Sequence, residues 1–233
     1  MSVTAIWGPP GSGKTTLATD LAFAISKRGR SVCLVSPEPY SEMSALLNVR
    51  IPEEQSIRAG ASAPDGLRQS VCRADGLLFV LAAASDADAF ESEISGADAR
   101  SVLTAAEAAF DSVIVDCPPR ADNPTAAWGL NLAQTVLLLT GFRSSAGFWH
   151  RAFRRAAGAF AEKTVPVCVQ GSDGMDYRAL NRMNDLTPRI WVPFFPASDS
   201  VRQMRRTLYD AGGKAGRNYN AAIDEICAAV KEA

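Results

Sequence analysis

Short runs of consecutive apolar residues recur along the chain, and stretches with helical periodicity separate them. Unbroken apolarity without alternation is typical of strands that are covered on both faces. A regular alternation of such strands with helices predicts an α/β fold, namely a three-layer, doubly wound and mainly parallel sheet with helices on both faces. The runs that we interpret as strands are residues 3–7, 32–35, 77–81, 113–115, 135–139, 165–169 and 190–192.

The stretches between the strands carry apolar residues three and four positions apart, as in Leu17, Leu21, Ala22 and Ile25, which is the spacing of one helix face. Residues 37–75 hold many prolines and glycines, so we interpret them as a loop around one short helix and as a candidate switch or lid. We see no linker and expect one domain over residues 1–233. The predicted helices are 15–27, 41–48, 86–109, 124–132, 145–161, 175–185, 199–210 and 217–231.

The first strand is followed by the letters G-P-P-G-S-G-K-T at residues 8–15, which fit the P-loop pattern G-x-x-x-x-G-K-[ST]. Glycines let consecutive backbone N–H groups point at phosphates, and the helix that follows aims its dipole at the same anion. We expect Lys14 to reach the β- and γ-phosphates of a nucleotide and Thr15 to place its hydroxyl on Mg²⁺. The residues predicted to bind the nucleotide here are Gly8, Gly11, Ser12, Gly13, Lys14, Thr15 and Thr16.

Asp116 ends the apolar run 113–115. A carboxylate at the end of a buried strand, downstream of a P-loop, is typical of a Walker B motif that holds the Mg²⁺ shell. AAA+ machines share the G-P-P-G-x-G-K-T loop, but they place a glutamate directly after this aspartate, where the chain has Cys117, and they carry a helical lid domain. We therefore do not expect an AAA+ machine. A small-molecule kinase is a more distant alternative, because such enzymes also combine a P-loop with a parallel sheet.

The letters D-C-P-P at residues 116–119 resemble switch II of the MinD/ParA group of P-loop ATPases, and the resemblance extends over nearly the whole chain. Residues 31–39 resemble the strand that leads into switch I of this group, with Ser36 and Glu38 at the positions of its two aspartates. Residues 134–139 resemble the group's strand before a threonine-rich turn, and residues 190–193 resemble its late strand ending in proline. Residues 200–229 resemble its final pair of helices.

The resemblance implies an ATPase that binds Mg²⁺ and ATP or ADP, and that reorders residues 36–50 and 116–124 when ATP binds. Members of the group position or recruit partner machinery in partitioning, pilus assembly or conjugation. This chain is most similar to divergent members, either CpaE/TadZ-like or ParA-like. A protein partner and a nucleotide-dependent homodimer are therefore expected. The resemblance assigns catalytic roles to Lys14, Glu38 and Asp116, and it implies adenine contacts for Gln170 and Pro193.

Pro9 is the clearest departure from the group, in which a lysine at this position crosses the dimer interface to the partner's nucleotide. Two alternatives follow. The chain is a slow ATPase that a partner stimulates, or it is an ATP-binding scaffold with little or no hydrolysis. Gln170 stands where the group has an Asn-Arg pair that reads adenine, and its amide carries the same donor and acceptor as asparagine.

Basic residues cluster on two predicted helices, residues 145–161 and 199–210. Three arginines and His150 belong to the first cluster, together with Arg143 just before the helix. Ordinary solvated helix faces explain such charge, and non-specific DNA binding is the alternative. We expect Trp149 in the core or at a protein interface, and His150 on an exposed face without a catalytic role. The arginines that would contact DNA are Arg151, Arg154, Arg155, Arg202, Arg205 and Arg206.

The formal net charge of -1 gives no global attraction to nucleic acid or anionic lipid. Five scattered cysteines without C-x-x-C spacing predict reduced, mostly buried thiols and, because no signal peptide is seen, a cytoplasmic location. No apolar stretch approaches about 18 residues, so we expect no transmembrane helix. The last helix has one narrow apolar stripe that we expect to pack on the domain: Ile223, Ile226, Cys227 and Val230.

Overall fold

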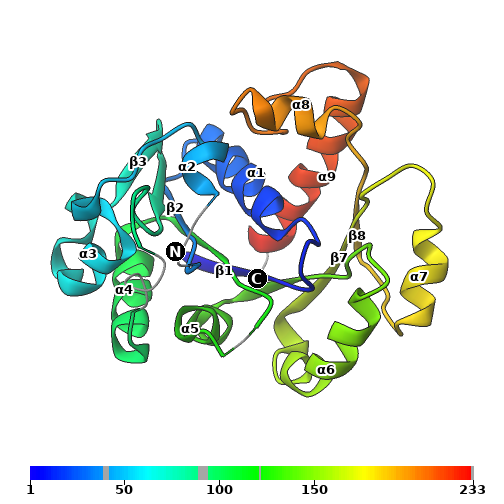
Figure 1. The fold of residues 1–233 in the computed structure, drawn as a ribbon, viewed down its shortest axis with the longest axis horizontal. Helices are drawn as coiled ribbons and strands as arrows, with labels where there is room; N and C mark the ends of the chain where they lie inside the picture. The colour runs from blue at the N-terminus through cyan, green and yellow to red at the C-terminus, as the bar shows by residue number, and fades with distance from the viewer. Residues whose placement is uncertain (39–41, 89–93, 121, 232–233) are drawn as a thin grey trace.

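The structure is a computed structural model that describes residues 1–38, 42–88, 94–120 and 122–231. In these residues the strands form one eight-stranded sheet in the order β3-β4-β2-β5-β1-β6-β7-β8 (Figure 1). Every neighbouring pair is parallel except β3 with β4, which confirms the predicted doubly wound, mainly parallel sheet. The strands are β1 (Ser2–Trp7), β2 (Val32–Val35), β3 (Cys72–Asp75), β4 (Leu78–Leu81), β5 (Ser112–Asp116), β6 (Thr135–Leu139), β7 (Thr164–Val169) and β8 (Ile190–Val192).

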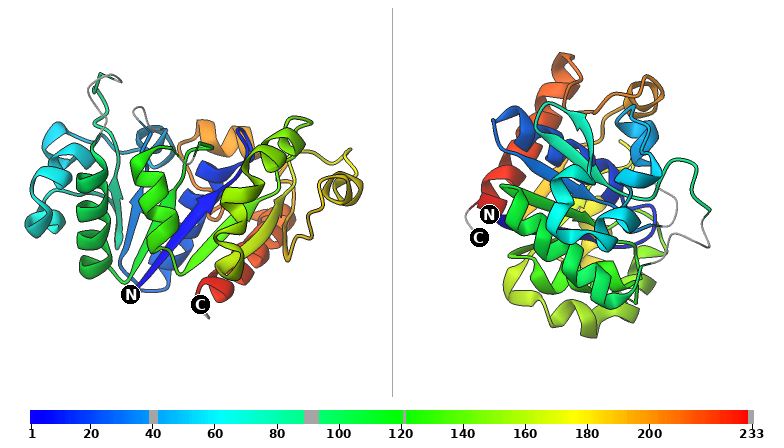
Figure 2. Two further views of the ribbon diagram at one scale, coloured as in Figure 1. Left: turned by 90° about the horizontal axis from the view of Figure 1, so that it is seen from below. Right: turned by 90° about the vertical axis from the view of Figure 1, so that its left-hand side faces the viewer.

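Helices cover both faces of the sheet, which explains why the strands read as unbroken apolar runs (Figure 2). Because successive strand residues point to opposite faces, Ile6 packs in one core and Trp7 in the other. On the first face lie α1 (Lys14–Lys27) and α9 (Gly213–Lys231), and on the second lie α4 (Gly96–Ala109), α5 (Pro124–Leu132) and α6 (Ala146–Gly158). The shorter helices are α2 (Met43–Leu46), α3 (Ile57–Ser62), α7 (Tyr177–Met183) and α8 (Ser198–Gln203).

The apolar stripe of α9 lies in the first core, as the sequence predicts. Ile223, Ile226 and Cys227 are completely buried, and Val230 is 5% exposed. Burying one aliphatic side chain contributes about 1.5–3 kcal/mol to folding, so the stripe holds α9 firmly on the sheet. None of the helices in the described residues is both long and apolar enough to cross a membrane.

The prediction of a loop over residues 37–75 is wrong for most of its length. The segment contains α3, two short 3₁₀ turns and the edge strand β3, which runs antiparallel to β4. Pattern reading misses β3 because the strand has only four residues and two of them, Arg73 and Asp75, are charged. Ile57 and Leu67 are buried in the second core, so this part of the chain is not a lid. Pro39 lies outside the described residues.

Three predicted helix boundaries also need correction. The helix expected from residue 86 begins at Gly96, because the Ser95 side chain caps it by accepting a hydrogen bond from Asp98 N. Residues 86–88 are not helical, and residues 89–93 lie outside the described part of the chain. The helix expected over 199–210 ends at Gln203, and Arg205 follows with a left-handed φ of 54°. The last helix begins at Gly213 instead of residue 217.

Asp20 is a buried carboxyl group that joins α1 to the chain before and within α9. The Tyr219 hydroxyl donates to Asp20 Oδ2 at 2.7 Å, and Tyr209 N donates to Oδ1 at 3.1 Å. Burial raises the pKa of Asp20 to about 6, and the two hydrogen bonds oppose this rise only in part. The α1 helix, which starts at the P-loop, is therefore fixed to the carboxyl-terminal part of the fold by a group that titrates near neutral pH.

We expect the Asp20→Asn variant to gain stability relative to the wild type as pH rises from about 4 to about 6. In this window native Asp20 keeps a proton that the unfolded chain has released, because its pKa is raised from 3.8 to about 6. The wild-type free energy of unfolding therefore falls with pH, by at most roughly 3 kcal/mol in all. Urea unfolding of both proteins across this range measures the difference.

The exposed Asp65 offers a matched control, whose replacement by Asn should change the free energy of unfolding little at any pH in this range. If the difference in free energy of unfolding between Asp20→Asn and wild type stayed constant from pH 4 to pH 7, the raised pKa of Asp20 would be contradicted.

Candidate functional site

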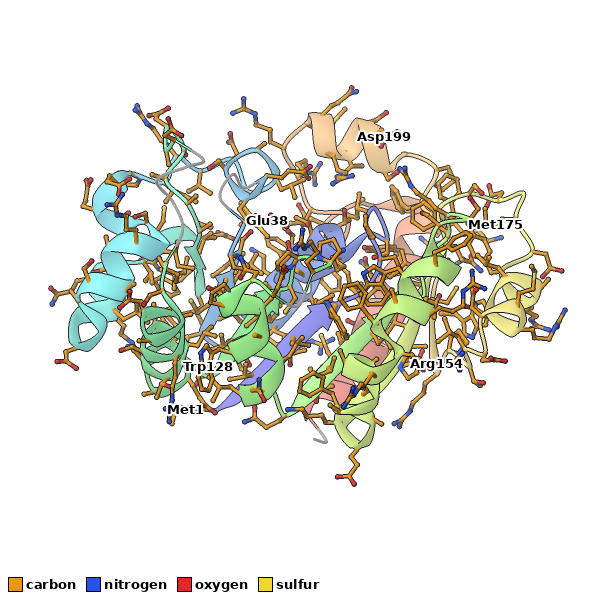
Figure 3. The ribbon with its side chains drawn as sticks, turned by 60° about the horizontal axis from the view of Figure 1, so that its bottom comes forward. Met1, Glu38, Trp128, Arg154, Met175 and Asp199 are labelled. Atoms are coloured by element: carbon orange, nitrogen blue, oxygen red, sulfur yellow. The ribbon has the colours of Figure 1, made fainter. Side chains whose placement is uncertain are left out.

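The register of β1 against β5 brings the two predicted motifs together. Ile6 pairs with Asp116, so the P-loop that follows β1 and the last residue of β5 meet at the carboxyl edge of the sheet. Thr15 Oγ1 donates a hydrogen bond to Asp116 Oδ2 at 2.8 Å, across 101 positions of sequence. Figure 3 shows Glu38 at this edge, opposite the edge where Met1 lies. Ligands of open α/β sheets bind at the carboxyl ends of the strands, so this is the candidate site.

Gly8 and Gly13 are two of the positions at which the P-loop depends on glycine. A Cβ at Gly8 would lie 2.8 Å from Leu139 O, so the backbone approaches β6 more closely than any side chain would allow. Gly13 has a left-handed φ of 87° directly before α1. Lys14, the next residue, is 8% exposed, and its Nζ donates to Pro9 O at 2.8 Å. The lysine thus folds back over its own loop, where a phosphate would compete for the same ammonium group.

A cavity of about 280 Å³ lies on one side of the P-loop. It contains the three residues to which the sequence analysis assigns catalysis, Lys14, Glu38 and Asp116, together with Thr15. They come from α1, from the segment after β2 and from the end of β5. The rest of the lining is Pro10, Gly11, Ser36, Glu42, Cys117, Pro118 and Pro119. Residues of both segments that the resemblance treats as switches therefore face one small space.

Burial dominates the electrostatics of this cavity. It raises the pKa of Asp116 to about 6 against the opposing effects of the Thr15 hydrogen bond and the Lys14 charge. Burial likewise raises the pKa of Glu38, which Lys14 lowers in part, and it lowers the pKa of Lys14 although Asp116 opposes the change. For Lys14, Glu38 and Asp116 alike, burial thus shifts the pKa toward the uncharged form.

Two buried oxygen atoms at the site, Asp116 Oδ1 and Ser12 Oγ, have no hydrogen-bond partner among the described residues. Leaving a buried polar group unpaired costs about 1–3 kcal/mol, so such atoms mark places where a ligand or its water shell fits. A carboxylate, a hydroxyl and phosphate oxygens are the donor set that Mg²⁺ prefers. The described residues contain no group of three or more His, Cys, Asp or Glu that would hold a metal alone. The donors therefore fit a metal ion that arrives with phosphates.

A second cavity, of about 690 Å³, lies on the other side of the P-loop. It is lined by residues 11–16 of the P-loop and by Gln170 and Pro193, which follow β7 and β8. Phe194 N donates to Gln170 Oε1 at 3.4 Å, so these two strand ends are also linked to each other. The volume is within the usual range for small-molecule sites. Gly8 is the one predicted nucleotide-binding residue that lines neither of these two cavities.

Comparison with known proteins now adds to this geometry. A family model described as AAA domain matches residues 1–122, which include β1, the P-loop and Asp116. The chain belongs to the AAA domain family. The carboxyl half of this AAA domain protein continues the same sheet with β6, β7 and β8, in contrast to the separate helical lid of AAA+ machines. A comparison with curated proteins gives no match.

Solved structures show which fold this AAA domain protein has. A ParA family ATPase from Chlorobium tepidum TLS is 13% identical, with 97% of this chain and 98% of that chain covered and a TM-score of 0.80. The cell division ATPase MinD of Pyrococcus furiosus is 18% identical, with 97% and 98% covered and a TM-score of 0.77. The septum site-determining protein MinD from Pyrococcus horikoshii OT3, complexed with Mg-ADP, is 16% identical, with 97% and 96% covered and a TM-score of 0.75. The fold is therefore that of the MinD/ParA P-loop ATPases, which confirms the resemblance seen in the sequence.

Sequence reasoning about this AAA domain protein misplaced His150 of α6 and left two places open for the neighbouring Trp149. His150 is buried, with 9% of its surface exposed, instead of lying on an exposed face. Its Nε2 lies 2.9 Å from Thr140 O, and burial lowers its pKa. Trp149 is 8% exposed, and its ring contacts Trp7 and Phe153 at centroid distances of 4.8 and 4.9 Å. Of the two places expected for Trp149, the core is therefore correct. Its Nε1 also donates to Pro119 O at 3.0 Å and so holds the segment after Asp116.

The basic residues do not lie together either. Arg143 precedes α6 and lines the larger cavity instead of joining the α6 arginines. Arg154 and Asp199, labelled in Figure 3, mark how far α6 and α8 lie apart. Arg205 and Arg206 lie beyond the end of α8, and Arg205 is in a turn. The sequence analysis missed three cavity residues, Arg143, Glu42 and Arg202, although Arg143 stands shortly after β6, where a ligand contact is expected.

We expect Trp149→Phe to lower the free energy of unfolding by about 1–2 kcal/mol, because it removes the hydrogen bond to Pro119 O while keeping an aromatic ring in the core. Urea denaturation measures this loss. Trp128→Phe is the control, because half-buried Trp128 of α5 makes no such hydrogen bond with the described residues. Equal effects of the two substitutions would show that the hydrogen bond contributes nothing.

Proposed function

We propose that this chain binds Mg²⁺ and ATP and is a slow ATPase that a partner stimulates, a nucleotide switch that positions or recruits partner machinery. One observation carries the proposal: Lys14, Thr15, Glu38 and Asp116 share one cavity beside the P-loop, where Asp116 Oδ1 lacks a partner among the described residues. The Mg-ADP in the Pyrococcus horikoshii relative of the same fold supports it.

In this proposal the phosphates lie along residues 11–16, with base and sugar in the larger cavity beside Gln170 and Pro193. Lys14 Nζ leaves Pro9 O and contacts the β- and γ-phosphates, because a charged acceptor binds an ammonium group more strongly than a carbonyl does. Thr15 and Asp116 would hold Mg²⁺, directly or through water, and the ion would offset the charge that builds up on the phosphates. Gly8 sets the path of the loop without touching the ligand.

Glu38 is the candidate for orienting the attacking water. Its carboxyl group lines the smaller cavity, and burial raises its pKa, which brings it closer to the range in which a carboxylate accepts a proton during reaction. Residues of the segments 36–50 and 116–124 meet in this cavity, so a γ-phosphate there would contact both. A ligand shifts a conformational equilibrium only through such differential contacts.

We also propose that residues 1–233 act as one domain, because the larger cavity takes residues from both halves of the chain. A protein partner and a nucleotide-dependent homodimer belong to the proposal. DNA binding is a weaker part of it, because Arg151 stacks on Phe148 and Arg206 pairs with Asp210. All five cysteines are free and buried, which supports a reducing compartment such as the cytoplasm.

A scaffold that binds ATP with little or no hydrolysis is the second candidate, and Pro9 favours it. Pro9 is buried, and a Cβ at Gly141 would lie 3.1 Å from Pro9 Cγ, so position 9 packs inside its own chain. No cation from this position reaches a second protomer, so the hydrolytic arrangement of the MinD/ParA group is incomplete here.

Lys14→Ala should weaken ATP binding at least 100-fold in isothermal titration calorimetry, because the variant loses the only cation of the P-loop. Lys27→Ala is the matched control. It lies on the same helix, pairs with Asp75 far from the cavity, and should keep wild-type affinity. Retained affinity in Lys14→Ala would refute ATP binding at this site.

Phosphate release separates the switch from the scaffold. If the chain hydrolyses ATP, Glu38→Gln and Asp116→Asn should each reduce turnover at least 10-fold, since one loses the group that orients water and the other a metal contact. The assay measures steady-state phosphate release with Asp65→Asn as the control, because Asp65 is an exposed carboxyl group outside the segments 36–50 and 116–124. Absent turnover in the wild type, with ATP bound, would favour the scaffold.

A further inference from the structure

The loop that follows β6 lies directly against the P-loop. Thr140 N donates to Val167 O at 3.0 Å, and Gly141, with a left-handed φ of 77°, packs on Pro9. Arg143 O accepts a hydrogen bond from Ala146 N at 2.9 Å, so the backbone of Arg143 is tied to the first residue of α6. Backbone contacts on both sides of Arg143 therefore fix the position of its Cα, from which the side chain extends.

The guanidinium group of Arg143 lies on Gly11. A Cβ at Gly11 would be 3.1 Å from Arg143 Nε and 3.3 Å from Cζ, closer than nearly all real contacts of this kind. Gly11 therefore leaves the space that the arginine occupies, in addition to adopting a left-handed φ of 64°. The same guanidinium lines the larger cavity together with residues 11–16 of the P-loop.

Arg143 forms no ion pair with any of the described residues. Two carboxylates, Glu42 and Asp199, line the same cavity, and Glu42 is engaged by Arg202 at 3.5 Å. A guanidinium with five N–H donors beside a phosphate-binding loop is suited to bidentate contact with phosphate oxygens.

We propose that Arg143 binds the α- or β-phosphate of the nucleotide, from the same chain that supplies the P-loop. The choice of phosphate follows from the two cavities: Arg143 lines only the larger one, whereas Glu38 and Asp116 line only the smaller one and Lys14 lines both. This inference rests on the proposed ATP binding. If the inference is correct, Arg143 contributes to the affinity for ADP and for ATP alike. Arg143 then does not replace a lysine that contacts the γ-phosphate.

The test is calorimetric titration of wild type and Arg143→Ala with Mg-ATP, Mg-ADP and adenosine. We expect the variant to lose about 10-fold or more in affinity for both nucleotides, by a similar factor, because both carry the α- and β-phosphates. Affinity for adenosine should not change. Arg143→Lys should recover only part of the loss, because an ammonium group makes no bidentate contact.

Arg155→Ala is the control, since Arg155 is an exposed arginine near the other end of α6 and lines neither cavity. A loss for ATP much larger than for ADP would overturn the assignment in favour of a γ-phosphate contact. An unchanged affinity for both nucleotides would also overturn it and leave Arg143 as a surface residue.

The two proposals fail in different ways. If Lys14→Ala loses binding while Arg143→Ala keeps it, ATP binding stands and the role of Arg143 is refuted. If the wild type binds neither nucleotide, both are refuted. Thermal unfolding without nucleotide completes the test: a melting temperature of Arg143→Ala well below that of Arg155→Ala would assign the arginine a structural role instead.

Discussion

The parallel pairing of β1 with β5 is the contact on which the rest of the site depends. It pairs Ile6, near the end of β1, with Asp116, the last residue of β5. Thr15 of the following P-loop therefore lies within hydrogen-bond distance of Asp116. Parallel neighbours need a long crossover, and here it includes β2, α3 and α4. The segment after β2 thereby returns to the same edge and delivers Glu38 to the smaller cavity.

The P-loop separates two spaces with different chemistry. On one side lie Lys14, the carboxyl groups of Glu38, Glu42 and Asp116, and residues 117–119. On the other side lie apolar and amide groups from the ends of β7 and β8, together with Arg143. In the proposed function, the base and the last phosphate would therefore be bound by separate parts of the sheet. Among the described residues, the two cavities share Gly11, Lys14, Thr15 and Glu42.

Much of this could be predicted from the sequence because the strands are covered on both faces and read as clear apolar runs. The P-loop and Asp116 are local motifs, so their positions follow once the sheet order is known. Edge strand β3 could not be predicted, because it pairs through few residues and its charged side chains hide the pattern.

The environment of α6 could not be predicted either, because helical spacing does not reveal how deeply a face is buried. Trp149 and His150 are covered by partners far away in the sequence, Trp7 and Pro119 in one case and the Thr140 carbonyl in the other. Arg143 was grouped with the α6 arginines because it is close to them in sequence, whereas tertiary packing places it on Gly11.

Pro9 and Pro10 have one further consequence, which concerns the supply of amide hydrogens. Proline carries no backbone N–H, so the loop has no amide hydrogen to donate between Gly8 and Gly11. Pro10 lines the smaller cavity and offers it no amide donor. The last phosphate of a triphosphate would then find its donors in side chains and metal-bound water. Discrimination between a spent and a fresh nucleotide would depend on Lys14, Glu38 and the metal ion, and hardly on the backbone.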